Sequence, residues 1–177
     1  MALKSVNQPI RWKERIGLMA IGHTFKQVEI FIFDLLLYPA AIALFGTVIG
    51  GLIMTVLSAV VCYLYILFYD WAKKDWLGLE LLKEIRDGKE KQGRIVRFVQ
   101  RIIRKGNGIA FLILSCYEDA FATTVYLRQG AEAYNGLSSR DWKIFWASVL
   151  VGNLWWTVIM TLVVEGVRLI ISWLGFN

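Results

Sequence analysis

The chain has 177 residues, of which 57% are hydrophobic and 19% charged, and its mean hydropathy is +0.52. Soluble domains carry about 25% charged residues, so this composition predicts one polytopic membrane domain and excludes a second, globular one. The formal net charge of +6 does not require a nucleic-acid partner, because basic loops on the cytoplasmic side of a membrane explain it more simply. With a single histidine, a histidine-based metal site is nearly excluded, and we expect neither a metal nor another cofactor.

Residues 1–26 form a polar lead with five Lys or Arg against one Glu, a net charge of +4. Its apolar residues gather imperfectly on one side, which predicts a short helix lying at the membrane interface. The first apolar stretch begins near Val28 and runs past the length of a signal-peptide core. It therefore predicts an insertion signal that is not cleaved.

Residues 28–70 contain the longest stretch without a charged side chain, from Leu35 to Tyr69. One membrane crossing takes about 20 helical residues, so this stretch is too long for one crossing and predicts two, folded back as a helical hairpin. We place the turn at Gly46–Gly51, because adjacent glycines break helices and permit positive φ. The same glycines also form a Gly-xxx-Gly pattern, which favours close packing of membrane helices.

Residues 71–105 form a basic block, which together with Asp70 holds eleven Lys or Arg and six Asp or Glu, a net charge of +5. In its second half the basic residues recur at steps of three and four, so they share one helical face opposite an apolar one. This pattern predicts a basic amphipathic helix on anionic lipid headgroups rather than a nucleic-acid site. The predicted membrane-surface residues are Arg94, Arg97, Arg101, Arg104 and Lys105.

Residues 109–164 predict a second helical hairpin, whose first arm is a third crossing at 109–127. The connection at 128–143 carries three basic and two acidic residues, a net charge of +1. Within it, Ser138-Ser139-Arg140-Asp141 is typical of a helix N-terminus and predicts the cap of the fourth helix. Residues 165–177 form a tail, in which Glu165 and Arg168 are spaced for a local salt bridge.

Charge sets the predicted topology. The lead and the basic block are separated by one hairpin, so they lie on the same side, and positive segments are cytoplasmic. The 128–143 connection then lies on the opposite side, and both termini are cytoplasmic. The predicted fold class is an all-α integral membrane protein of the bacterial plasma (inner) membrane. It has four transmembrane helices as two hairpins, with amphipathic interfacial helices on the cytoplasmic face.

Two adjacent carboxylates, Glu118 and Asp119, interrupt the predicted third crossing near the middle of the bilayer. Charged groups at that depth cost about 2.5–3.5 kcal/mol each, so they are candidates for a functional site. The two should not both stay ionised there. Asn153 lies at a similar depth in the fourth helix and could hydrogen-bond a protonated carboxyl.

The first crossing contributes two more acidic residues, Glu29 and Asp34, of which Asp34 is the deeper. An ion pair with Lys26, or with an arginine of the amphipathic helix, is the structural explanation for them. Three interpretations of the intramembrane polar residues stay open: a proton or cation site, a polar clasp between helices, or a re-entrant third segment. The candidate residues for an ion site or a polar clasp are Glu118, Asp119, Asn153 and Asp34.

No catalytic constellation is present: the sequence lacks a Ser-His-Asp or Cys-His set and zinc-ligand spacing. We therefore favour a non-enzymatic protein that acts as a subunit or assembly partner of a membrane complex, as a homo- or hetero-oligomer. The alternative is a small transporter or oligomeric channel for protons or cations that uses the intramembrane carboxylates. A membrane-bound enzyme of lipid metabolism comes third.

Overall fold

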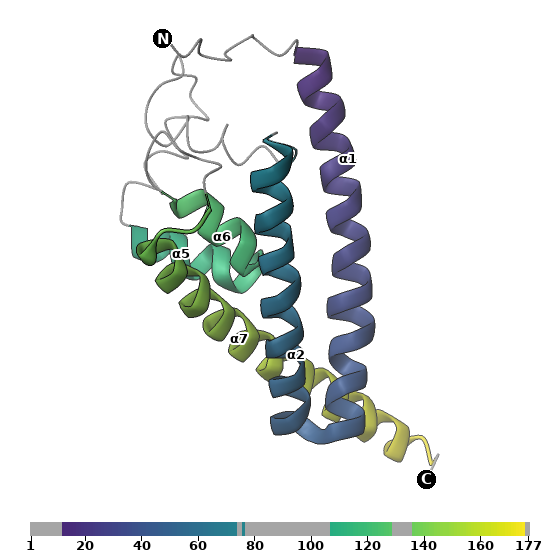
Figure 1. Cartoon of the computed structure of the whole chain (residues 1–177). Coiled ribbons are helices and arrows are strands. Elements are labelled where there is room, and N and C mark those ends of the chain that lie inside the picture. Colours follow the sequence, from purple (N-terminus) through teal and green to yellow (C-terminus); the bar gives the residue numbers. More distant parts are fainter. Residues whose placement is uncertain (1–11, 74–75, 77–106, 129–135, 176–177) are drawn as a thin grey trace, which may run out of the picture.

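The computed structural model describes residues 12–73, 76, 107–128 and 136–175, and over these residues it is helical and has no strand. Figure 1 shows the arrangement of the helices. The predicted membrane-surface residues, Arg94 to Lys105, lie outside the described residues. The elements are α1 (Trp12–Ile30), the π-helix η1 (Phe31–Leu37), α2 (Tyr38–Ala72), α5 (Asn107–Tyr117), α6 (Ala120–Leu127) and α7 (Ser139–Trp173).

The helical path that begins with α1 reverses at Gly46, inside the span of α2 (Figure 1). Gly46 has φ 77° and ψ 168°, a conformation that is essentially restricted to glycine. Gly50 then packs against the preceding arm, where a Cβ would lie 2.6 Å from the carbonyl oxygen of Ala41. The predicted turn is therefore confirmed at Gly46, and the close-packing interpretation applies to Gly50.

The N-terminal lead does not form a separate surface helix over its described part. α1 begins at Trp12 and continues without a break through Ile30 into η1. The predicted short helix is therefore not a separate element over residues 12–26, and its place at a membrane interface stays a prediction. The single glycines of this stretch are tolerated inside a helix, so nothing local separates the lead from the apolar stretch.

The predicted third crossing at 109–127 is not one helix, and this is the main correction to the four-crossing layout. α5 ends at Tyr117, and Asp119 is extended (φ −151°, ψ 177°) before α6 begins. At about 1.5 Å per residue, the 11 residues of α5 extend about 16 Å, roughly half of a 30 Å hydrocarbon core. The break occurs because the Asp119 side chain caps α6, accepting a hydrogen bond from the Ala122 N–H at 2.6 Å.

α7 begins as predicted and runs the length of the molecule. Ser138 is its N-cap, and a capping box joins Ser138 to Asp141. Near its other end, Arg168 donates a hydrogen bond to the Ala43 carbonyl oxygen at 3.2 Å, close to the turn at Gly46. The predicted salt bridge between Arg168 and Glu165 is confirmed, with an N–O distance of 2.6 Å.

The described ends of the 128–143 connection, Arg128 and Gly136, lie at the end of the molecule where α2 finishes, which we call the Asp70 end. Arg128 donates to Asp70 at 2.7 Å, and the Gly136 N–H donates to the same carboxylate at 3.0 Å. Asp141 lies 4.0 Å from the other side of the Arg128 guanidinium. The prediction that this connection lies opposite the end of α2 is therefore wrong, because α6 returns to the Asp70 end.

The described chain begins and finishes at opposite ends of the molecule (Figure 1). α1 starts toward the Asp70 end, where Gly22 packs against the backbone of Trp76. α7 finishes at the other end, beside the Gly46 turn, which we call the Gly46 end. The described chain thus has its two ends apart, whereas the prediction placed both termini on one side of a membrane.

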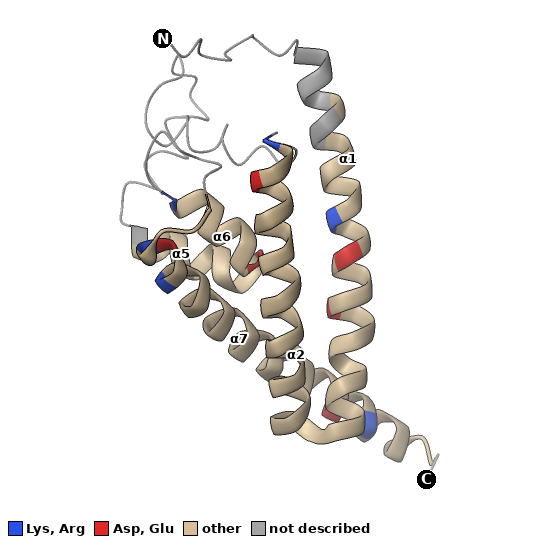
Figure 2. Ribbon diagram, viewed as in Figure 1, with Lys and Arg blue, Asp and Glu red and all other residues tan. Residues whose placement is uncertain are grey.

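Two helical segments are long and apolar enough to cross a membrane, Ala20–Ala72 and Ser139–Trp173, and the most apolar 18 residues of each have mean hydropathies of 2.3 and 1.8. Only 28% and 33% of their most apolar windows are buried inside the molecule, whereas a core helix of a soluble protein is mostly buried. Their outward surfaces carry large apolar side chains such as Leu44, Val48 and Leu154. Figure 2 shows that the charged residues of these segments occur near helix ends and along one part of the path through α1 and η1.

Candidate functional site: a polar cavity between four helical segments

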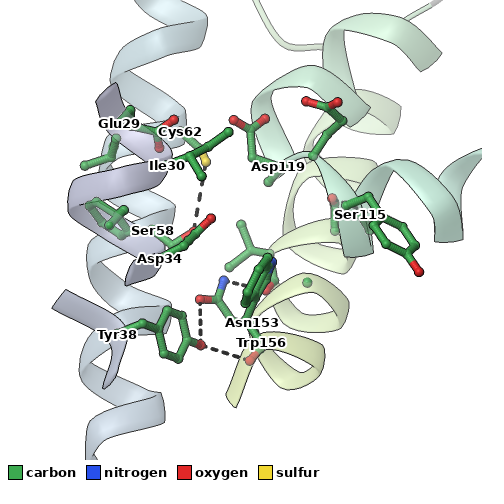
Figure 3. Close-up of a pocket in the computed structure, with 18 of the residues that line it drawn as sticks. Glu29, Ile30, Asp34, Tyr38, Ser58, Cys62, Ser115, Asp119, Asn153 and Trp156 are labelled. Atoms are coloured by element: carbon green, nitrogen blue, oxygen red, sulfur yellow. Dashed lines mark hydrogen bonds between the residues drawn. The ribbon is translucent and has the colours of Figure 1, made fainter. Parts of the chain in front are cut away.

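A small polar cavity lies where the path through α1 and η1 faces α2, α7 and the break between α5 and α6 (Figure 3). Its volume is about 50 Å³, enough for a few water molecules. All four candidate residues from the sequence line it: Asp34, Glu118, Asp119 and Asn153. The fold thus brings together residues that lie more than one hundred positions apart in the chain.

Lys26 is the central cation of this site. Its ammonium donates one hydrogen bond to Glu29 at 2.7 Å and another to the Asp119 carboxylate. The three side chains are only 11–15% exposed, so the pairs are largely desolvated. The ion pair predicted between Glu29 and Lys26 is confirmed, and the bond to Asp119 ties α1 to the break between α5 and α6.

Asp119 has two functions at the break. One carboxylate oxygen accepts the Ala122 N–H and the other accepts the Lys26 ammonium. Its backbone carbonyl also accepts the Thr123 hydroxyl at 2.7 Å. A helix N-terminus carries partial positive charge, so the Asp119 carboxylate has positive charge on two sides.

Asp34 lies on the π-helix η1 and lines the cavity, as Figure 3 shows. Within the described residues its carboxylate has no hydrogen bond or ion pair, so the pairing expected with Lys26 does not occur. It precedes Gly46 by twelve residues, about 18 Å along a helix, which is near the middle of a bilayer-sized structure. Single π-helical turns are frequent at functional sites, where they redirect a side chain.

Asn153 forms the floor of the cavity without contacting the carboxylates. The Tyr38 hydroxyl donates to the Asn153 carbonyl oxygen at 2.9 Å and lies 3.0 Å from the Thr157 hydroxyl. The Asn153 amide donates to the Val149 carbonyl at 2.8 Å. Asn153 was expected to hydrogen-bond a protonated carboxyl. Instead, its hydrogen bond with Tyr38 holds the start of α2 against α7.

The wall between α5 and α7 is built from small residues. A Cβ on Gly152 would lie 2.4 Å from the Ser115 carbonyl oxygen, and the Ser115 hydroxyl donates to Ser148 at 2.8 Å. This close approach holds α5 against α7 just before the break. The wall therefore fixes the position at which the Asp119 carboxylate enters the cavity.

Sequence reasoning missed Lys26 and Tyr38 as site residues. Lys26 was grouped with the basic lead, yet it stands eight residues before Asp34, two turns along the same helical path. That spacing could have placed both side chains on one helix face. Tyr38 has no comparable sequence signal, because its partner Asn153 lies 115 residues away.

The charges of the cavity do not balance. Glu29, Asp34, Glu118 and Asp119 contribute four carboxyl groups, and Lys26 is the only cation among the lining residues. One ammonium cannot neutralise four carboxylates, of which only Glu118 is exposed, so the site favours binding of additional positive charge. In the described part of the chain, no group of three or more His, Cys, Asp or Glu is arranged to hold a metal ion.

No protein-family model, curated protein or solved structure matches this chain.

Proposed function

We propose that this protein resides in a membrane and binds and releases protons at the cavity around Lys26, as a small proton-transporting protein. The observation that carries the proposal is the excess of carboxyl groups, with Asp34 facing the cavity without a partner among the described residues. A proton is the cation that fits best, because Lys26 already occupies the position between Glu29 and Asp119. Ionisable groups inside a membrane are typical of proton relays.

The proposed membrane arrangement has three crossings and one re-entrant pair. The crossings are the arm before Gly46, the arm after it, and α7, while α5 and α6 enter from the Asp70 end and return to it. The described start of α1, the last residues of α2, and Arg128 and Gly136 lie toward the Asp70 end, and the segments next to them in the sequence carry net charges of +4, +5 and +1. By the positive-inside rule this end is cytoplasmic, which places the C-terminus on the other side.

Reporter fusions test this arrangement directly. Fusions at Gly88 and Gly136 are both expected to report the cytoplasmic side, and a fusion after Asn177 the opposite side. A fusion at Gly136 that reports the opposite side from Gly88 would restore the four-crossing layout. A C-terminal fusion on the cytoplasmic side would contradict the third crossing by α7.

In the proposed mechanism, binding of a proton in the cavity changes the contact between α1 and the break that separates α5 from α6. Protonation of Asp34 would change the charge beside Lys26, and the bond from Lys26 to Asp119 joins α1 to the break between α5 and α6. Broken membrane helices are a recurring feature of transport sites, where their ends face the transported ion. Asp34, deeper in the cavity, would exchange the proton with the Lys26 cluster.

Proton flux into liposomes tests the function. Wild-type protein should acidify vesicles that contain a pH-sensitive dye when a membrane potential is applied, and Asp34→Asn and Asp119→Asn should reduce the rate about tenfold or more. Glu165→Gln is the matched control, because it removes a carboxylate that lies outside the cavity and is half exposed. Infrared spectroscopy adds a binding readout: the protonated-carboxyl band should appear on acidification and shrink in Asp34→Asn.

The proposal is overturned if wild-type vesicles leak no faster than empty ones and the infrared band does not titrate. It is also overturned if Asp34→Asn and Asp119→Asn transport protons at the wild-type rate. An equal loss in Glu165→Gln would show that the flux reports general membrane leakage.

A second candidate function, a subunit or assembly partner, is favoured by one observation. Glu118 and Tyr117 are exposed at the break, and a charged group on a membrane-facing surface requires covering. However, Asp119, Glu29 and Asn153 all have partners within the chain, so most of the polar groups that motivated this hypothesis need none outside it. Cross-linking through a cysteine at Tyr117 in native membranes tests it, because a subunit would give one discrete adduct.

A further inference from the structure

A second hollow, distinct from the polar cavity, lies between α1 and α2 toward the Asp70 end. It has a volume of about 510 Å³ and is lined by Ile21, Gly22 and Phe25 of α1 and by Leu64, Phe68 and Ala72 of α2, among others. No Cα atom of α1 lies within 8 Å of one of α2, so the two helices enclose a groove here rather than a packed interface. We call it the α1–α2 groove.

Aromatic rings close one side of this groove. Trp76 lies 6.4 Å from Phe25 and 5.9 Å from Phe68, measured between ring centroids. Tyr65 lies 6.0 Å from Phe25 on the way to the polar cavity. The groove therefore offers a nearly continuous apolar and aromatic surface, with no charged side chain among its lining residues.

The rim of the groove carries an exposed tryptophan, Trp71, and an exposed lysine, Lys73. Trp71, 78% exposed, faces outward beside it, as tryptophans do at the boundary between lipid and water. Lys73 directly follows Ala72 and caps α2 with an exposed side chain. Along the chain, the basic block continues directly from Lys73 and, counted with Asp70, has a net charge of +5.

We infer that the α1–α2 groove is a binding site for one anionic phospholipid, with an acyl chain between α1 and α2 and the headgroup near Lys73. An acyl chain is the apolar partner that a membrane supplies in excess, and the volume is within the range of ligand-sized pockets. Charge complementarity selects an anionic headgroup, because each Lys or Arg near the surface attracts such lipids. The inference does not depend on proton transport at the polar cavity.

Native mass spectrometry of the purified full-length protein tests the site. After incubation with phosphatidylglycerol or with phosphatidylcholine of matched chains, the wild type should retain one phosphatidylglycerol and much less phosphatidylcholine. Ala72→Trp should fill the groove and reduce retention about tenfold or more. Ala147→Trp is the matched control, because Ala147 is an exposed alanine of α7 far from the groove in sequence, and it should retain lipid as the wild type does.

A second pair of variants keeps the inference testable if Ala72→Trp does not fold. Leu64→Trp adds bulk to the groove wall, whereas Leu57→Trp makes the same change two turns earlier on α2, outside the lining. Lys73→Gln tests the headgroup and should reduce phosphatidylglycerol retention about fivefold without changing that of phosphatidylcholine. Far-ultraviolet circular dichroism of each variant establishes that it folds.

Three results would overturn the inference. One is equal retention of lipid by the groove variants and their controls. Another is equal retention of phosphatidylcholine and phosphatidylglycerol by the wild type. A third is a dimer that dissociates only in Ala72→Trp and Leu64→Trp, which would make a second copy of the chain the occupant of the groove.

Discussion

The helical path of this protein breaks at Gly46 and again at Glu118–Asp119, and the two breaks differ in kind. At Gly46 the break is conformational: a positive φ reverses the chain, and a Cβ would meet no other atom within 4 Å. At Asp119 the break is chemical, since the carboxylate caps α6 and binds a cation from α1. The first break only redirects the chain, whereas the second places ionisable groups beside a cavity.

The largest expected effect comes from removing the carboxylate at the second break. Asp119→Ala loses the cap of α6 and one partner of the buried Lys26, which together should lower the free energy of unfolding by about 3–4 kcal/mol. Detergent-induced unfolding in micelles measures this. Asp119→Asn, which retains a capping oxygen, should be less destabilised, and equal losses in the two variants would show that the charge contributes nothing.

At the first break, we expect the stability of the protein to depend only on the backbone conformation of residue 46. Gly46→Val forces a β-branched residue into a region that only glycine adopts readily, which should lower the free energy of unfolding by about 1–3 kcal/mol. Proton flux per folded molecule should be unchanged, because Gly46 does not line the cavity. A Gly46→Val protein that unfolds at the wild-type detergent concentration would contradict the strained turn.

The close packing of α5 against α7, just before the second break, can be tested by adding one methyl group at Gly152. Gly152→Ala places a Cβ about where the Ser115 carbonyl lies, so it should push α5 away from α7 and lower the free energy of unfolding by about 1–2 kcal/mol. Gly166→Ala, on the same helix but with no atom within 4 Å of its Cβ, is the control. If both alanine variants unfold alike, packing at Ser115 does not hold the break in place.

The smallest effect is expected away from the cavity and from the second break, in the last turns of α7. The ion pair between Glu165 and Arg168 joins two side chains that are each 55% exposed. Glu165→Gln should therefore change the free energy of unfolding by less than about 0.5 kcal/mol. A larger loss would indicate that Arg168 needs this pairing to bond the Ala43 carbonyl near the Gly46 turn.

The sequence indicated which residues form the candidate site, but it did not indicate which residues they contact. Asp34, Glu118, Asp119 and Asn153 were identifiable because polar groups are costly in apolar helices, and all four line the cavity. Their partners were not, since Lys26 bonds a residue 93 positions away and Tyr38 one 115 positions away. Hydropathy measures what a side chain costs in a membrane, and it carries no information on which side chain neutralises it.

By itself, the sequence determined the helical class, the reversal at Gly46 and the capped start of α7. Each follows from local chemistry: apolar length, glycine's conformational freedom and the capping ability of Ser138. Only the tertiary structure decided that residues 109–127 turn back at Asp119, which moves the following connection to the Asp70 end. The physical reason is that a lone carboxylate is costly in an apolar segment, and here the α6 N-terminus and the distant Lys26 both stabilise it.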